Sequence, residues 1–213
     1  MQLYNYFYYF SNVLTPKFCN EVLEYGKSQQ KQIGLTGKIG KNRDIKTNPL
    51  TKKELKDLKK TRDSEIVWLN ERWIYREIFP YIKEANQKAG WNFDWDWSES
   101  CQFTKYSPGQ YYGWHCDSFP IPYNNLNQNF NNKIRKLSVT CSLSDPSEYE
   151  GGELEFNFNN PEGRKKENIR KCSEILPKGS IVVFPSFVWH RVCPVKKGTR
   201  YSLVIWNLGY PFK

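Results

Sequence analysis

The sequence has no long hydrophobic run: none of its 213 residues lies in a stretch approaching the roughly 18 apolar residues needed to cross a bilayer as a helix. The aromatic segment at residues 4–10 is too short and too polar for a secretory signal, and no basic segment precedes it. The six cysteines show no CxxC spacing. We therefore expect reduced thiols in a cytoplasmic protein.

Histidine is also scarce, because the chain contains only His115 and His190. On an extended strand, residues two apart project to the same face, so His115 and Asp117 would present an imidazole and a carboxylate side by side. His190 follows the apolar stretch ending at Phe184 and can supply a third ligand from another strand. Two imidazoles and one carboxylate form the facial triad that binds Fe(II) in oxygenases and leaves positions open.

A fixed cation follows the second histidine. Arg200 lies ten residues after His190, and Ser202 would share its face of a strand. A 2-oxoacid that chelates a metal at one end needs such a partner for its far carboxylate. Arginine offers a bidentate fork that never loses its charge. The two residues therefore predict a carboxylate anchor beside the metal.

Charge does not decide the function. The chain has 32 Lys and Arg against 22 Asp and Glu, a net charge of +10 that is compatible with a nucleic-acid surface or an acidic substrate. The lysines are spread along the chain, however, and no clustered arginine stripe accompanies them. Aromatic residues make up 16% of the chain, which argues against disorder, and the length suits one domain over residues 1–213.

The first part of the chain predicts helices. Thr15 is a candidate N-cap before Pro16, with a helix expected up to about Gly26. Thr51 opens a capping-box pattern for a short polar helix. Apolar residues at helical spacing predict a longer helix over 64–89, kinked or split at Pro80. We therefore interpret residues 1–95 as a mainly helical support.

Alternation replaces the helical period beyond residue 95. One strand is predicted where Leu137, Val139, Cys141 and Leu143 alternate with serines and a threonine, and others are predicted over 179–185 and 200–206. The polar segment 124–132 predicts a loop that serves either as a lid or as an inert insertion. The fold class is α+β: a double-stranded β-helix, or jelly roll, of about eight strands over residues 96–213.

Several motifs now resemble the Fe(II)/2-oxoglutarate dioxygenase superfamily, in its prolyl 4-hydroxylase-like, PKHD-type branch. Residues 106–117 match the branch's Tyr-x-x-Gly-Gln-x-Tyr-x-x-His-x-Asp motif. Residues 143–154 and 190–200 are similar to PKHD-type hydroxylases, and the ending over 206–213 is similar to oxygenases carried by marine phages. The resemblance runs from about Gln102 to the C-terminus.

The resemblance implies a role for each matching residue. The iron ligands would be His115, Asp117 and His190. The 2-oxoglutarate contacts would be Arg200 and Tyr106, beside the Ser202 hydroxyl already expected from its strand position. The substrate contacts would be Tyr112, Arg135 and Trp206, although these three also suit core or rim positions. Collagen-type enzymes have lysine in place of Arg200, and Ser142 replaces a tyrosine that several relatives use near the cosubstrate.

The implied cofactors are Fe(II), 2-oxoglutarate and O2, with ascorbate as a candidate reductant. The expected reaction is hydroxylation of a substrate C–H bond with release of succinate and CO2. A prolyl or other side chain of a protein or peptide is the first candidate substrate. The alternatives are a nucleobase, a free amino acid or a small metabolite, or a metal-binding jelly roll without turnover. No membrane partner is expected, and a phage-encoded enzyme would act in the host cytoplasm.

Overall fold

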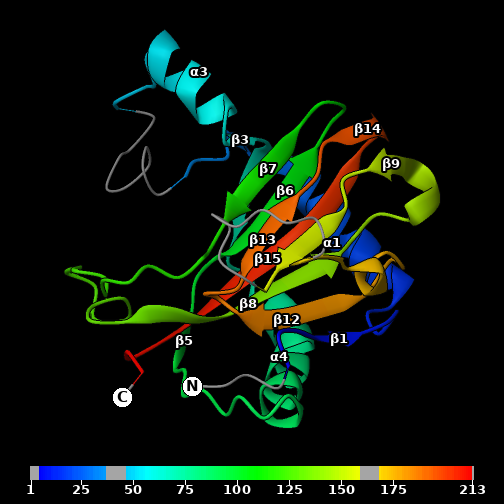
Figure 1. The fold of residues 1–213 in the computed structure, drawn as a ribbon. Helices are drawn as coiled ribbons and strands as arrows, with labels where there is room; N and C mark the ends of the chain where they lie inside the picture. Colours follow the sequence, from blue (N-terminus) through cyan, green and yellow to red (C-terminus); the bar gives the residue numbers. More distant parts are fainter. Residues whose placement is uncertain (1–4, 37–46, 159–167, 213) are drawn as a thin grey trace.

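The computed structural model describes residues 5–36, 47–158 and 168–212. Antiparallel strands dominate it, accompanied by three α-helices in the described part of the chain (Figure 1). The helices are α1 (Pro16–Ser28), α3 (Lys52–Lys59) and α4 (Arg72–Lys88), and short 3-10 turns span Pro146–Glu148 and Ser173–Ile175.

The larger sheet has the strand order β1-β12-β8-β15-β6-β4-β2, with β5 added beside β15. Its strands are β1 (Tyr8–Phe10), β12 (Ile181–Pro185), β8 (Ile134–Ser142), β15 (Arg200–Gly209), β6 (Cys101–Tyr106), β4 (Glu65–Leu69), β2 (Gln32–Ile33) and β5 (Trp97–Ser98).

The smaller sheet has the order β11-β10-β13-β7-β3, and β14 pairs with β9 separately. Its strands are β11 (Ile169–Lys171), β10 (Leu154–Asn157), β13 (Trp189–Val192), β7 (Tyr111–His115) and β3 (Arg62–Asp63), and the separate pair is β9 (Tyr149–Gly151) with β14 (Val195–Gly198).

Helices α1 and α4 cover one face of the larger sheet. From α4, the side chains of Ile74, Ile78 and Ile82 are fully buried against strand residues such as Val139 and Leu203. Burying each of these isoleucines contributes about 1.5–3 kcal/mol. The helical period of α4 therefore places its apolar stripe on the sheet, as the sequence predicts.

The opposite face of the larger sheet packs on the smaller sheet. Val182 and Phe184 of β12 join Leu154 and Phe156 of β10 in a second apolar cluster, whereas Ile181 and its alternating neighbour Val183 face the helices. The strand predicted over 179–185 is confirmed as β12, which begins at Ile181 and is apolar on both faces. The space between the two sheets is where the candidate site lies.

The helix boundaries follow from local capping. Thr15 accepts a hydrogen bond from the Phe18 N–H, and Thr51 forms the complete capping box with Glu54. Each cap contributes about 1 kcal/mol. The starts of α1 and α3 are thus confirmed, while α1 continues past the expected end at Gly26 to Ser28.

The helix predicted over 64–89 is wrong in its first part. Residues Glu65–Leu69 form β4, which pairs with β6, and α4 begins only at Arg72. Pro80 lies inside α4, which continues to Lys88, so of the two outcomes expected at Pro80, a kink or a split, the split does not occur. Strands β1 to β4 also show that residues 1–95 are more than a helical support, because they extend both sheets.

The polar segment 124–132 lies in the connection between β7 and β8 and forms no strand, as expected. Its asparagines hydrogen-bond the local backbone: the Asn127 N–H donates to the Asn125 side chain, and the Asn129 N–H donates to the Asn127 side chain. Whether the segment is a lid or an inert insertion stays a prediction. In the part of the chain that the structure describes, no helix is long and apolar enough to span a membrane.

Candidate metal and cosubstrate site

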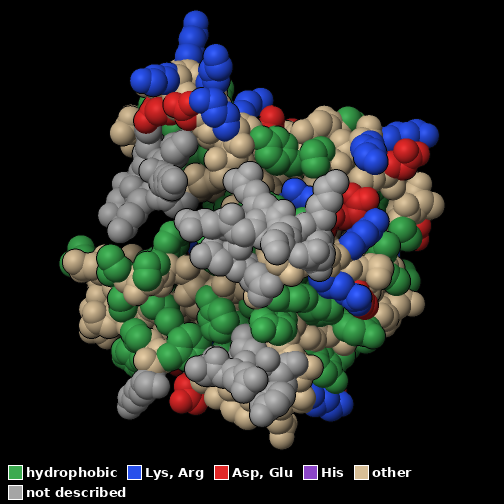
Figure 2. Space-filling view, in the orientation of Figure 1, with side chains coloured by type: hydrophobic (Ala, Val, Ile, Leu, Met, Phe, Trp, Pro, Cys, Tyr) green, Lys and Arg blue, Asp and Glu red, His purple; other side chains and the backbone are tan. Residues whose placement is uncertain are grey.

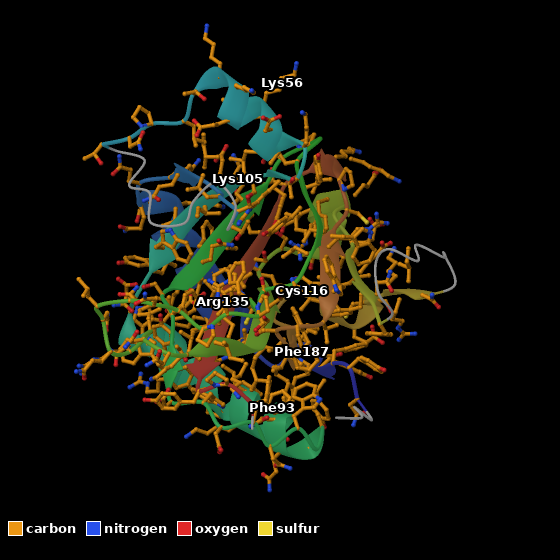
Figure 3. All side chains as sticks on the ribbon, turned by 60° about the vertical axis from the view of Figure 1, so that its left-hand side comes forward. Lys56, Phe93, Lys105, Cys116, Arg135 and Phe187 are labelled. Carbon is orange, nitrogen blue, oxygen red and sulfur yellow. The ribbon has the colours of Figure 1, made fainter. Side chains whose placement is uncertain are left out.

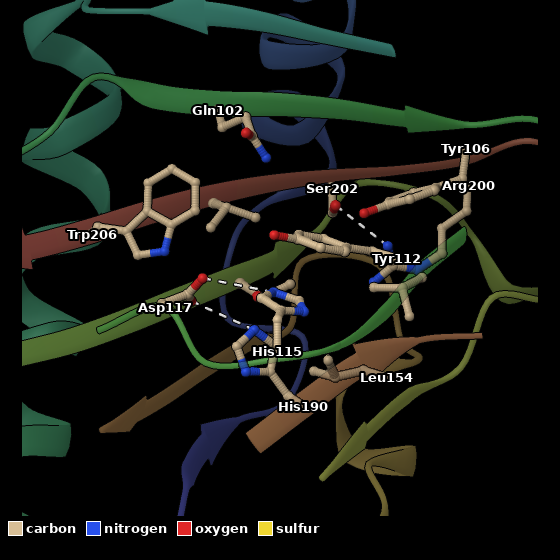
Figure 4. A pocket seen from close by; sticks show the side chains of 13 residues that line it. Gln102, Tyr106, Tyr112, His115, Asp117, Leu154, His190, Arg200, Ser202 and Trp206 are labelled. Atoms are coloured by element: carbon tan, nitrogen blue, oxygen red, sulfur yellow. Dashed lines mark hydrogen bonds and ion pairs between the residues drawn. The ribbon is translucent and has the colours of Figure 1, made fainter. Parts of the chain in front are cut away.

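The pairing of β13 with β7 places the only two histidines opposite each other. His190 is the register partner of His115, and Asp117 follows two residues after His115, just beyond the end of β7. The Nε2 atoms of His115 and His190 lie 3.7 and 3.5 Å from the Asp117 carboxylate oxygens. One donor atom from each of the three residues falls within 4.8 Å of the others (Figure 4). The structure therefore brings the three predicted ligands together.

Backbone carbonyls fix the orientation of both imidazole rings. His115 Nδ1 lies 2.8 Å from the Gly113 carbonyl oxygen, and His190 Nδ1 lies 2.9 Å from that of Val188. A carbonyl only accepts, so each Nδ1 carries the hydrogen and donates it. The lone pair is then on Nε2, which faces Asp117, and this is the tautomer that a metal ligand needs.

Burial and charge set the protonation of the triad. Burial, with the neighbouring His190, lowers the pKa of His115 to about 3, so this ring is neutral at physiological pH. Burial alone would raise the pKa of Asp117, but His190, His115, Arg135 and a Ser138 hydrogen bond outweigh it and hold the pKa at about 2. A neutral imidazole beside an ionised carboxylate suits a divalent cation.

A buried arginine faces the same pocket from β15. Arg200 is 3% exposed, and its Nη1 donates to the Ser202 hydroxyl at 3.3 Å. Tyr106 of β6 is the residue paired with Arg200 across the two strands, and the Arg200 guanidinium lies 5.6 Å from the centre of the Tyr106 ring. Among the described acidic side chains none pairs with Arg200. A buried cation without an anion is costly, so this position fits a carboxylate brought by a ligand.

The phenol ring of Tyr112 separates the metal ligands from a second buried arginine. The Tyr112 ring stacks on the His115 ring, with the two ring centroids 3.5 Å apart. The Arg62 guanidinium, from the neighbouring strand β3, lies 4.6 Å from the centre of the Tyr112 ring. Burial raises the pKa of Tyr112 to about 12, so the phenol keeps its proton. Tyr112 lines the pocket, and its role as a substrate contact stays a prediction.

The other two predicted substrate contacts lie together at the opposite end. Trp206 lines the pocket, and its buried indole Nε1 has no acceptor among the described residues. The Arg135 guanidinium lies 3.9 Å from the centre of the Trp206 ring. It donates two hydrogen bonds of 2.6 Å to the Glu99 carboxylate. Arg135, with 16% of its side chain exposed, thus packs half-buried against the Trp206 ring, and it is not among the residues that line the pocket.

Several residues of the site were not singled out from the sequence. Glu99, Arg62 and Ser138 have no motif around them. One signal was available for Ser138: it belongs to the polar half of the alternating β8 segment, and Ser138, Thr140 and Ser142 are all buried. Buried polar residues alternating with core residues indicate that the second face of a strand borders a polar site.

Gly152 leaves space for the Arg200 side chain, and filling this space tests how much the position of Arg200 matters. A Cβ on Gly152 would lie 2.9 Å from Arg200 Cδ, whereas a Cβ on Gly90 would meet nothing within 4 Å; φ is +64° and +73° respectively. Both alanine variants carry a left-handed backbone cost of about 1 kcal/mol. Of the two variants, only Gly152→Ala should weaken 2-oxoglutarate binding to the Mn(II)-loaded protein, because its Cβ displaces Arg200. We expect a loss of about tenfold, since one charge-assisted hydrogen bond from Arg200 contributes about 1.5 kcal/mol.

Isothermal titration calorimetry compares the two variants, and thermal unfolding checks that both stay folded, with the larger loss of stability in Gly152→Ala because its Cβ also meets Val195 Cγ2 at 3.0 Å. Equal 2-oxoglutarate affinities in Gly152→Ala and Gly90→Ala would show that Arg200 tolerates the displacement.

Comparisons with known proteins agree with this geometry. A PKHD-type hydroxylase of Synechococcus sp. (strain CC9605) is 38% identical over 104 residues, covering 49% of this chain and 39% of the relative. One from Xanthomonas euvesicatoria pv. vesicatoria is 34% identical over 105 residues, covering 49% of this chain and 42% of the relative. The chain thus matches about two fifths of the length of these curated relatives.

Solved structures share the fold over nearly the whole chain. The viral collagen prolyl hydroxylase of Paramecium Bursaria Chlorella virus-1, in complex with 2OG, has a TM-score of 0.61 at 20% identity and covers 97% of both chains. A prolyl hydroxylase of Trichoplax adhaerens, in complex with a hypoxia inducible factor peptide fragment, has a TM-score of 0.64 at 20% identity, covering 96% of this chain and 84% of that one. The likeness to phage oxygenases is only weakly supported, through the viral enzyme.

The sequence pattern of the 2OG-Fe(II) oxygenase superfamily matches residues 101–207, which include all nine predicted site residues. Fe(II), 2-oxoglutarate and O2 are the cofactors of this family, and the donor set and buried arginine described above fit the first two. The chain therefore belongs to the 2OG-Fe(II) oxygenase superfamily.

Proposed function

We propose that this protein is an Fe(II)- and 2-oxoglutarate-dependent dioxygenase that hydroxylates a C–H bond, with a prolyl or other side chain of a protein or peptide as the first candidate substrate. The observation that carries the proposal is one pocket lined both by a His115, Asp117 and His190 cluster and by the buried Arg200 cation. A structural metal site has no use for such a cation. The two sheets would then be the double-stranded β-helix expected from the sequence, within one domain.

Each residue has a defined task in this proposal. The Nε2 atoms of His115 and His190 and the carboxylate of Asp117 would hold Fe(II), which supplies the activation of dioxygen. Arg200, with Ser202, would hold the far carboxylate of 2-oxoglutarate, and Tyr106 would border it. One oxygen atom then ends in succinate and the other in the hydroxylated product, with loss of CO2. The protein's own contribution is orientation and exclusion of water.

Tyr112 and Trp206 would contact the substrate, with Arg135 holding the Trp206 ring. The free indole N–H of Trp206 needs an acceptor, and the carbonyl oxygen of a peptide can provide one. The similar Trichoplax structure contains a bound peptide fragment, which supports a peptide as the first candidate. Ascorbate as a reductant stays a prediction.

Nucleic acid is the second candidate because of the basic helix α3. Lys52, Lys53 and Lys56 are exposed on it, and no ion pair joins them to a described acidic residue. Figure 2 shows Lys and Arg side chains gathered at the top of the molecule, where Figure 1 has α3, and Figure 3 shows Lys56 on this helix, above Lys105 and Arg135. Because α3 leads directly into β3 at the edge of the smaller sheet, a polyanion bound there would pass near the pocket.

Substrate turnover tests the proposal. The protein is incubated with Fe(II), 2-oxoglutarate, ascorbate and O2, together with proline-containing peptides, single-stranded oligonucleotides or free amino acids. We expect one succinate to form for each hydroxylated prolyl peptide. Mass spectrometry should detect this peptide by its gain of one oxygen atom. Oxidation of a nucleobase, without hydroxylation of a peptide, would replace the peptide by nucleic acid as the assigned substrate. Iron and 2-oxoglutarate binding without succinate from any compound would favour the non-catalytic binding module.

Trp206→Phe tests the substrate role of the indole N–H. This change keeps an aromatic ring against Arg135 but removes the donor. Losing one hydrogen bond costs about 0.5–1.5 kcal/mol, so we expect KM for the peptide to rise by about 2–10-fold while KM for 2-oxoglutarate is unchanged. Trp97→Phe, at an exposed position of β5 away from the pocket, is the control. An unchanged peptide KM would remove Trp206 Nε1 from the substrate contacts.

A further inference from the structure

Two buried serines stand behind the carboxylate of the metal cluster. Ser138 belongs to β8, and Ser186 directly follows β12. Both side chains are 0% exposed, and neither lines the pocket. They are therefore out of reach of a substrate or cosubstrate, and their hydroxyl groups must find their hydrogen-bond partners inside the protein.

The hydroxyl groups form a directed chain that ends on Asp117. Ser138 Oγ donates to Asp117 Oδ2 at 2.7 Å, and the two serine Oγ atoms are 2.9 Å apart. Since an ionised carboxylate only accepts, the single hydroxyl hydrogen of Ser138 is committed to Asp117. Ser186 must then be the donor in the second bond. The order is Ser186 to Ser138 to Asp117.

Ser186 also fixes the backbone of the same aspartate. Its carbonyl oxygen accepts the N–H groups of Asp117 and Ser118 at 2.9 Å each, and its own N–H donates to the Lys136 carbonyl oxygen at 2.9 Å. The segment after β12, the segment after β7 and strand β8 are thereby tied together at one point. The Asp117 main chain and its carboxylate thus have little freedom to rotate.

We infer that Ser138 and Ser186 are positioning residues that make Asp117 a one-oxygen metal ligand; this inference rests on the proposed function. Ser138 donates to Oδ2, which also lies 3.5 Å from His190 Nε2, so Oδ1, 3.7 Å from His115 Nε2, is the carboxylate oxygen without a hydroxyl donor and the one we assign to the metal. One-oxygen binding leaves three coordination positions for 2-oxoglutarate and dioxygen. A carboxylate released from Ser138 is free to turn and bind through both oxygens, which fills one of those positions.

Metal titrations of the full chain test this inference without turnover. Mn(II) affinity is followed by the paramagnetic resonance of the free ion, and Co(II) binding by its visible spectrum, which reports coordination number. We expect Ser138→Ala to weaken Mn(II) binding by about 10–100-fold, the usual effect of losing a partner behind a metal ligand, and to change the Co(II) spectrum. Ser186→Ala should show a smaller loss, and Ser138→Thr, which keeps the hydroxyl, should restore the wild-type values.

Ser180→Ala is the matched control. Ser180 is equally buried and its hydroxyl accepts the Asn12 N–H, so its loss affects packing without touching the cluster. Wild-type affinity and an unchanged Co(II) spectrum in both Ser138→Ala and Ser186→Ala would overturn the inference while leaving the metal site intact. A wild-type chain that binds neither metal would instead overturn the proposed function itself. If Ser138→Ala does not fold, Ser186→Ala carries the same comparison.

Discussion

Arg200→Ala is expected to abolish measurable 2-oxoglutarate binding while Mn(II) or Fe(II) binding stays within a few-fold of wild type. Removing one partner of a buried charge pair costs about 3–5 kcal/mol, which corresponds to a loss of affinity of about 150-fold to 4,000-fold. The metal ligands are on β7, β13 and the segment after β7, so they do not depend on this side chain of β15. Calorimetric titration of 2-oxoglutarate into the Mn(II)-loaded protein measures the effect.

Arg200→Lys and Arg170→Ala are the companions of this variant. Lysine keeps the charge but not the fork, so we expect partial binding. Arg170 is an exposed arginine of β11 paired with Glu174, and its removal should leave 2-oxoglutarate affinity unchanged. Loss of metal binding in Arg200→Ala, with 2-oxoglutarate binding lost only as a consequence, would contradict the anchor assignment.

Asp117→Asn is expected to remove stable metal binding and to leave the fold intact. The amide has the shape of the carboxylate and still accepts the Ser138 hydrogen bond, but it lacks the negative charge that a divalent cation requires. We expect Mn(II) affinity to fall at least ~100-fold. Because the surroundings hold the pKa of Asp117 below its usual value, the folded protein favours the ionised carboxylate, so the metal-free variant should unfold at a temperature somewhat below that of the wild type.

Metal titration and thermal unfolding of the metal-free proteins measure the two effects of Asp117→Asn separately. Adding Mn(II) should raise the unfolding temperature of the wild type and not that of the variant, since a ligand stabilises only the state that binds it. An equal rise in both proteins would mean that the metal binds elsewhere.

The sequence predicts the ligands well because their chemistry is local or periodic. His115 and Asp117 are two residues apart, so one strand conformation decides their relation. The scarcity of histidine leaves His190 as the only imidazole that can join them. Arg200 and Ser202 are again two apart on β15, and the structure places both side chains at the pocket.

The residues that hold these ligands could not be found in the same way. Ser138 and Ser186 are 48 positions apart, and Arg135 and Glu99 are 36 apart. Such pairs depend on which strands become neighbours, which local patterns do not encode. The same reason explains the error at β4: Ile66 and Val67 continue the helical spacing of α4, but pairing with β6 determines their conformation.

The central claim is tested most directly by anaerobic titration of Fe(II) and 2-oxoglutarate into the metal-free protein, following the visible metal-to-ligand charge-transfer band. The account predicts a band that saturates at one equivalent of Fe(II) and is absent in His115→Ala. No band in the wild type, or an equal band in His115→Ala, would contradict the assignment of His115, Asp117 and His190 as an iron site that binds 2-oxoglutarate.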